Sequence, residues 1–192
     1  MSKAVLISIK PEWCDLIFRG KKTIEVRKTV PTQMETPFKV YIYCTKAPKG
    51  WLNLLTGEQL DSRVIGEFTC DHVYQYSSDY NSCRPVDGTD ITTEEMVRQS
   101  CLSAEKLYRY EYSAEPKENC LYTVGLYGWH ISGLVIYKKP KELSGFWKPC
   151  PHGEDSSCFV CDKSGYMPDM HIDCFNTITR PPQSWCYVED VT

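Results

Sequence analysis

The segment from Gly20 to Arg27 carries the side chains best suited to bind or transform a ligand. It lies within residues 19–28, which hold five cations and one anion. Glu25 and Arg27 are two positions apart, so on a strand they share one face and either pair with each other or both face a cleft. An arginine in a cleft can grip a phosphate with two parallel hydrogen bonds, and a glutamate can accept from a base amino group. Lys22 could neutralise a phosphate or act as a base. The sequence leaves open both a structural ion pair and a ligand site.

Aromatic side chains offer a second way to hold a base. The chain has 13 Tyr and 5 Trp, and stacking a base on one aromatic ring contributes about 1–3 kcal/mol without overall positive charge. His130 follows Trp129 near a strand end, and we expect it to be packed against its neighbours. Each aromatic residue is also a natural core residue. The stacking candidates are Trp129, Tyr127, Trp185 and Tyr43.

Five of the eleven cysteines crowd into the last part of the chain, between Cys150 and Cys186. Cys158 and Cys161 have the spacing of a zinc knuckle. We expect residues 146–176 to form a cysteine-rich insertion with one structural zinc per chain, because four thiolates close a tetrahedral shell. His171 is the alternative to Cys150, His152 is also in reach, and unliganded thiols are a further alternative. The preferred ligands are Cys150, Cys158, Cys161 and Cys174.

Composition and charge narrow the class of protein. The net charge of −3 excludes a uniformly basic nucleic-acid coat, so any nucleic-acid site must be a local patch. No apolar run reaches the roughly 18 residues that cross a bilayer, and the N-terminus lacks the pattern of a signal peptide. We therefore expect a cytoplasmic protein with reduced thiols, in which Cys186 and the six cysteines before Cys150 pack as small core residues.

Hydrophobic alternation and turn residues predict mostly strands. The helix predicted over 12–19 follows Pro11 and ends at Gly20, and it is flanked by strands over 4–9 and 23–29. Thr92 and Glu95 form a capping box for a helix to about 101, and a second helix follows to about 112. Residues 77–91 are expected to be a loop. Further strands are predicted over 38–44, 63–74, 120–137 and 184–189. The pattern indicates an α+β, mainly β fold, a barrel or mixed sheet with short helices.

The motif and its context resemble the ASCH family. Gly20–Arg27 matches the Gly-x-Lys-x-x-Glu-x-Arg signature, it lies between helix and strand as in that family, and Val64–Phe68 is similar to the next strand. Residues 179–189 resemble the tail of phage-associated bacterial members. The resemblance implies a PUA-like fold, a small β-barrel with short flanking helices and a cleft beside the motif. We expect residues 1–192 to form one such domain, with the cysteine-rich segment as an insertion within it.

The resemblance also implies a function. ASCH domains are proposed to bind RNA, related YTH and EVE domains hold modified bases in aromatic pockets, and some small ASCH proteins hydrolyse acylated cytidines with a Lys–Thr–Glu set. Lys22 matches that lysine, but Glu25 stands at the threonine position, and Thr23 is two residues earlier. We therefore expect an RNA- or modified-nucleotide-binding module. The alternative is a hydrolase or nuclease, and a protein that binds a host protein is a third class.

These readings assign residues to two sets. The expected nucleic-acid-binding residues are Lys10, Lys22, Glu25, Arg27 and Trp129. The catalytic candidates of the alternative reading are Lys22, Thr23, Glu25 and Glu67.

Overall fold

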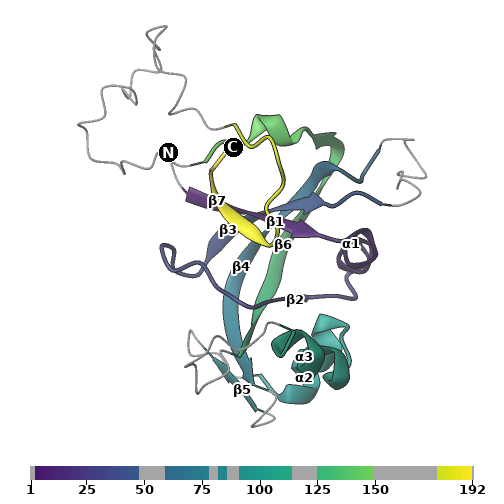
Figure 1. Cartoon of the computed structure of the whole chain (residues 1–192), viewed down its shortest axis with the longest axis vertical. Helices are drawn as coiled ribbons and strands as arrows, with labels where there is room; N and C mark the ends of the chain where they lie inside the picture. The colour runs from purple at the N-terminus through teal and green to yellow at the C-terminus, as the bar shows by residue number, and fades with distance from the viewer. Residues whose placement is uncertain are drawn as a thin grey trace, which may run out of the picture.

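The computed structural model describes residues 3–47, 59–77, 82–85, 91–113, 125–148 and 177–191, with backbone alone for 82–85. Its elements are β1 (Lys3–Ile9), α1 (Pro11–Phe18), β2 (Ile24–Arg27), β3 (Phe38–Cys44), β4 (Arg63–Ser77), β5 (Ser82–Pro85), α2 (Thr93–Ser100), α3 (Ala104–Glu111), β6 (Leu126–Lys141), the 3-10 turn η1 (Leu143–Gly145) and β7 (Trp185–Glu189). Figure 1 shows α2 and α3 together at one end of the molecule, beside β5.

The strands form one mixed sheet in the order β2-β6-β4-β3-β1-β7, with β5 paired to β4. β1 and β3 are parallel, and the other pairings are antiparallel. This confirms a mainly β, α+β fold. Among the described residues no ladder joins β2 to β7, so the closed barrel stays a prediction.

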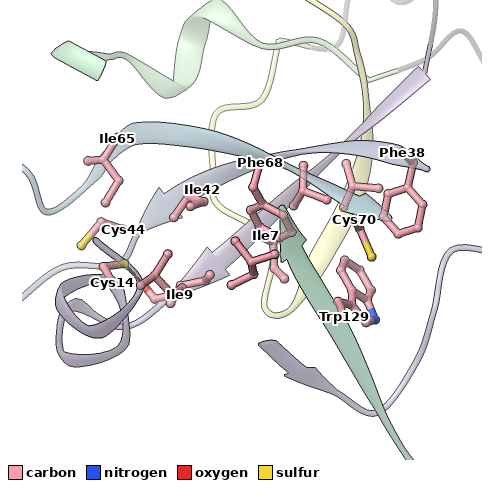
Figure 2. Close-up of a cluster of buried hydrophobic side chains, with 14 of the residues drawn as sticks. Ile7, Ile9, Cys14, Phe38, Ile42, Cys44, Ile65, Phe68, Cys70 and Trp129 are labelled. Carbon is pink, nitrogen blue, oxygen red and sulfur yellow. Dashed lines mark hydrogen bonds between the residues drawn. The ribbon is translucent and has the colours of Figure 1, made fainter. Parts of the chain in front are cut away.

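The main core lies on one face of the sheet, under α1. It holds the inward side chains of β1, β3 and β4 together with Trp129 of β6, which Figure 2 shows closing one end of the cluster. Trp129 meets Phe38 edge to face at 5.6 Å between ring centroids. Cys14, Cys44 and Cys70 are fully buried here, which confirms their expected role as small core residues.

The helices α2 and α3 cover a second apolar cluster on the opposite side of β2. Ile24 of β2 packs there with Met96 of α2 and Leu107 of α3. Gly128 of β6 makes this approach possible, because a Cβ at that position would lie 2.8 Å from the Met96 sulfur and 2.9 Å from the Ile24 side chain. The packing places α3 beside β2, where the predicted motif lies.

Local signals in the sequence set the ends of the helices. The Thr92–Glu95 capping box is present in full, and Ser103 accepts from the Lys106 amide at the start of α3. Gly20 follows α1 with φ of +66°, a conformation that glycine adopts at little cost. The predicted loop over 77–91 is wrong in one part, because β5 returns along β4 within it.

The two ends of the cysteine-rich segment lie next to each other. The Ile178 amide donates to the Phe146 carbonyl at 2.9 Å, and Trp147 bridges to Thr177. Phe146 is fully buried and meets Tyr41 at 4.9 Å. Residues 149–176, which include the predicted zinc ligands, lie outside the described residues. In the described part of the chain, no helix combines the length and apolar character that crossing a bilayer would need.

Candidate functional site

A cavity of about 590 Å³ lies beside β2. Its walls come from the end of β1 and the turn after it (Ser8–Lys10), from α1, from β2, from α3 and from residues 181–183. Segments that are far apart in the sequence therefore meet around one space.

The floor of this cavity is an ion-pair network of Lys22, Glu25 and Arg27. The Lys22 ammonium lies 3.3 Å from Glu25 Oε2, and Arg27 Nη2 lies 3.0 Å from Glu25 Oε1. The three residues are only 2%, 6% and 9% exposed. Glu25 and Arg27 therefore pair with each other and also line the cavity, so the ion pair is present and the ligand site stays a prediction.

Backbone contacts fix this network to three elements. Lys22 Nζ donates to the carbonyls of Ile24 at 2.8 Å and of Ser100, at the end of α2, at 2.7 Å. Arg27 Nη2 donates to the Ser8 carbonyl of β1 at 2.6 Å. The network thus holds β2 against β1 and α2, which explains why the polar face of this strand is buried.

Two polar atoms of the network keep unused hydrogen-bonding capacity. Glu25 Oε2 and Arg27 Nε are buried without a hydrogen-bond partner among the described residues. Glu25 Oε2 is within ion-pair distance of Lys22 Nζ but forms no hydrogen bond with it, and that ammonium donates to two carbonyls instead. Such atoms are costly unless a ligand or water satisfies them.

Trp13 of α1 and two residues of α3 build the walls above this floor. The Lys22 ammonium lies 5.4 Å from the Trp13 ring centroid, and the Lys106 ammonium lies 5.9 Å from it. Tyr110 lines the same cavity one helical turn beyond Lys106. Sequence reasoning missed all three side chains. Only the i, i+4 spacing of Lys106 and Tyr110 could have shown that they share one flank of α3.

Tyr110 keeps its proton at neutral pH. Burial raises the pKa of the Tyr110 hydroxyl, the charge and hydrogen bond of Arg27 oppose this, and the charge of Glu25 adds to it. The phenol therefore stays available to a ligand as both donor and acceptor.

The cavity is strongly cationic. Among the described residues, the charged groups that line it are Lys10, Lys22, Arg27, Lys106 and one carboxylate, Glu25, which gives them a formal charge of +3. The whole chain has a net charge of −3. Positive charge is thus concentrated where a ligand would enter, and a cleft of one sign attracts ligands of the other.

Two of the predicted catalytic residues lie elsewhere. The Thr23 hydroxyl donates to the Gln99 side chain at 3.0 Å, and Thr23 does not line the cavity. Glu67 of β4 accepts from the Tyr137 hydroxyl and lies 3.9 Å from the Lys39 ammonium. The structure therefore brings Lys10, Lys22, Glu25 and Arg27 together and leaves Thr23 and Glu67 apart from them.

The predicted stacking residues do not line the cavity either. Trp129 is 0% exposed, and Tyr43 is buried in a separate cluster. Tyr127 and Trp185 pack against the main core, with Trp185 donating to the Thr29 hydroxyl at 3.0 Å. The aromatic surfaces of the cavity belong instead to Trp13 and Tyr110.

His130 is paired rather than simply packed. Its Nδ1 lies 2.6 Å from Asp71 Oδ1, and its ring centroid is 6.0 Å from that of His72. Partial burial alone would raise the pKa of Asp71, but the hydrogen bond and charge of His130 lower it overall from the usual 3.8. Within the described ranges no cluster of three metal-binding side chains occurs, at this pair or elsewhere.

Comparison with known proteins identifies the fold. No family model matches the chain, and no curated protein sequence matches it. A Tyr-to-Phe mutant of the ASCH protein from Zymomonas mobilis is 17% identical, with a TM-score of 0.52 over 98% of this chain and 92% of that one. A Ser-to-Ala mutant of the same protein is 16% identical, with a TM-score of 0.51 over 97% and 89%. The chain is therefore similar to ASCH structures in fold, as the resemblance of Gly20–Arg27 predicted.

Proposed function

We propose that this chain, which has the PUA-like fold of the ASCH structures, binds RNA or a modified nucleotide in the cavity beside β2. One observation carries the proposal. A carboxylate, an arginine, further cations and two aromatic side chains line a single space of about 590 Å³. That volume falls within the range of small-molecule sites, roughly 300–1,000 Å³.

Each group has a separate part in holding a nucleotide. Trp13 offers a ring on which a base can stack. The Glu25 carboxylate can accept from a base amino or imino group, and Tyr110 can donate or accept. The cations attract phosphate. Since the Lys22 ammonium already donates to two carbonyls, its part is to fix Glu25, and its direct contact with ligand is limited.

A hydrolase or nuclease has less support. Lys22 has little capacity left to act as a base, because its ammonium is committed to two carbonyls and a carboxylate. Thr23 bonds Gln99 outside the cavity, and Glu67 contacts Tyr137 on another part of the sheet. Glu25, at the threonine position of the hydrolytic relatives, is a weaker nucleophile held between two cations.

The proposal includes the architecture that the fold implies. Residues 1–192 form one domain whose sheet closes into a PUA-like barrel, and residues 146–176 form a cysteine-rich insertion. Its adjoining ends at Phe146 and Ile178 support this reading.

Binding of a short single-stranded RNA of mixed sequence tests the function. Loss of one stacked base costs about 1–3 kcal/mol, so Trp13→Leu should weaken binding about 5- to 150-fold. Trp147→Leu is the matched control, since Trp147 is 39% exposed and does not line the cavity. Tyr110→Leu serves as a second cavity variant, and thermal unfolding checks that each variant folds. Full affinity in folded Trp13→Leu and Tyr110→Leu would overturn the proposal. Mass spectrometry of nucleotides that co-purify would identify the ligand.

A further inference from the structure

We propose that the cavity selects ligands with a terminal phosphate monoester, which Lys10 and Lys106 hold at its rim. The inference rests on the proposed nucleotide binding and names the class of nucleotide. It predicts that a nucleoside monophosphate or a phosphorylated RNA end binds better than the matching unphosphorylated form.

The two rim lysines are free to accept an anion. Lys10 directly precedes α1, Lys106 lies in α3, and both are exposed while lining the cavity. Among the described residues, neither ammonium has a carboxylate within ion-pair distance. Lys22 and Arg27 differ from them, because Glu25 partly neutralises the charges of these two residues.

The charge at the rim matches a monoester better than a diester. A phosphate monoester carries about −1.5 to −2 charges at pH 7, with its second pKa near 6. An internal phosphodiester carries one. Two unpaired ammonium groups can neutralise the monoester in full, whereas one diester leaves a lysine without a counter-ion. Net neutralisation therefore favours a terminal phosphate.

Lys106 also has its ammonium over the Trp13 ring, where the base of a ligand would stack. Its ammonium lies 5.9 Å from the Trp13 ring centroid, a cation–π distance, and Trp13 is its neighbour across the cavity. The other cation at this ring, Lys22, is fixed by two carbonyls. A base that stacks on Trp13 must compete with Lys106, and the displaced ammonium becomes available to the phosphate of the same ligand. Base and phosphate thus support each other's binding.

The test compares phosphorylated and unphosphorylated ligands by isothermal titration calorimetry. The probes are the four common nucleosides, their 5′- and 3′-monophosphates, and one single-stranded RNA with a hydroxyl or a phosphate at each end. At pH 7.5 the phosphorylated form of at least one pair should bind about tenfold tighter or more. The preference should shrink at pH 5.5, where the monoester loses its second charge.

Lysine variants locate the effect. Lys10→Gln and Lys106→Gln should each reduce the preference for the phosphorylated form about threefold or more, and the double variant should abolish it. Lys21→Gln is the matched control, because Lys21 is exposed and does not line the cavity. Nucleosides that bind as tightly as monophosphates, with affinity lost in Trp13→Leu, would overturn this inference and leave the proposed function standing. A phosphate preference that survives the double variant would place the phosphate elsewhere and also overturn it. Absence of binding to every probe would overturn both proposals.

Discussion

Replacement of Lys22 by methionine should be among the most destabilising single changes at the residues that line the cavity. Methionine keeps the unbranched stem and removes the ammonium. The change leaves the carbonyls of Ile24 and Ser100 without their donor and removes one of the two cations beside Glu25. The residue is 2% exposed, so water cannot easily replace these partners.

The magnitude follows from the contacts. A hydrogen bond from a charged donor contributes roughly 1.5–3 kcal/mol, and loss of one partner from a buried ion pair costs about 3–5 kcal/mol. The two figures overlap because they describe the same ammonium. The Glu25–Arg27 pair persists at 3.0 Å, and the buried methionine side chain offsets part of the loss. We expect a net loss of about 3–4 kcal/mol in the free energy of unfolding.

Urea unfolding followed by tryptophan fluorescence measures this loss. With a slope of roughly 2 kcal/mol/M, the midpoint should fall by about 1.5–2 M at unchanged slope. The control is Lys21→Met, the same substitution at the exposed neighbouring lysine, which should change stability by no more than about 0.5 kcal/mol. If the two variants unfold at the same urea concentration, the network does not anchor β2 and our account of the cavity floor fails.

Three further predictions concern other groups. The pKa of Asp71 is lowered in the folded chain, so its ion pair contributes fully to stability at pH values well above the usual 3.8. That contribution disappears as the pH falls through the lower folded value. Asp71→Asn should therefore reduce the fall of the urea midpoint between pH 6 and pH 2.5. Thr23→Ala should leave ligand affinity unchanged within about twofold, and a larger loss would contradict this. The wild type should not hydrolyse acylated cytidine efficiently, and robust turnover abolished by Thr23→Ala would contradict that expectation. Metal analysis of protein purified without chelator should find one zinc per chain, and a chelator should expose new cleavage sites only between Gly145 and Arg180. Less than about a tenth of a zinc, with all thiols reactive, would refute the predicted ligands Cys150, Cys158, Cys161 and Cys174.

Most elements of the fold could be predicted because their signals are local. Alternation of apolar residues marks β3, the capping box at Thr92 starts α2, and Gly20 ends α1 with a positive φ. The missed strand β5 is four residues long, contains Pro85 and lies among turn-forming residues, so its pairing with β4 depends on tertiary structure.

The site could be predicted only in part, for a physical reason. Glu25 and Arg27 are two positions apart on β2, so their common face can be read from spacing alone. Lys22 lies before the strand, and its bonds to the carbonyls of Ile24 and Ser100 hold it beside Glu25. Lys106 and Tyr110 join them through long-range contacts, such as the bond from Lys22 to the Ser100 carbonyl at the end of α2. A sequence shows that α3 has a polar flank, but it does not show which surface that flank faces.

Trp129 shows that residue type can suggest a binding role for a side chain that lies in the core. A tryptophan beside a strand end suggests a stacking platform, yet its pairing with Glu25 across β2 and β6 directs it into the main core. Trp13 is a better platform because it lies in the first turn of α1, at the edge of the core and not within it. Trp13 lines the cavity and Trp129 does not. This difference depends on tertiary packing, which the sequence does not show directly.

The net negative charge of the chain and its cationic cavity together bear on selectivity. A chain with a net charge of −3 repels long nucleic acid as a whole, so non-specific binding by counterion release should be weak. The cavity, with a formal charge of +3, attracts only the part of a ligand that can enter its 590 Å³. A duplex is too wide to do so, whereas a single nucleotide or a strand end is not. Affinity for such an end should therefore depend on its chemistry far more than on the length of the RNA behind it.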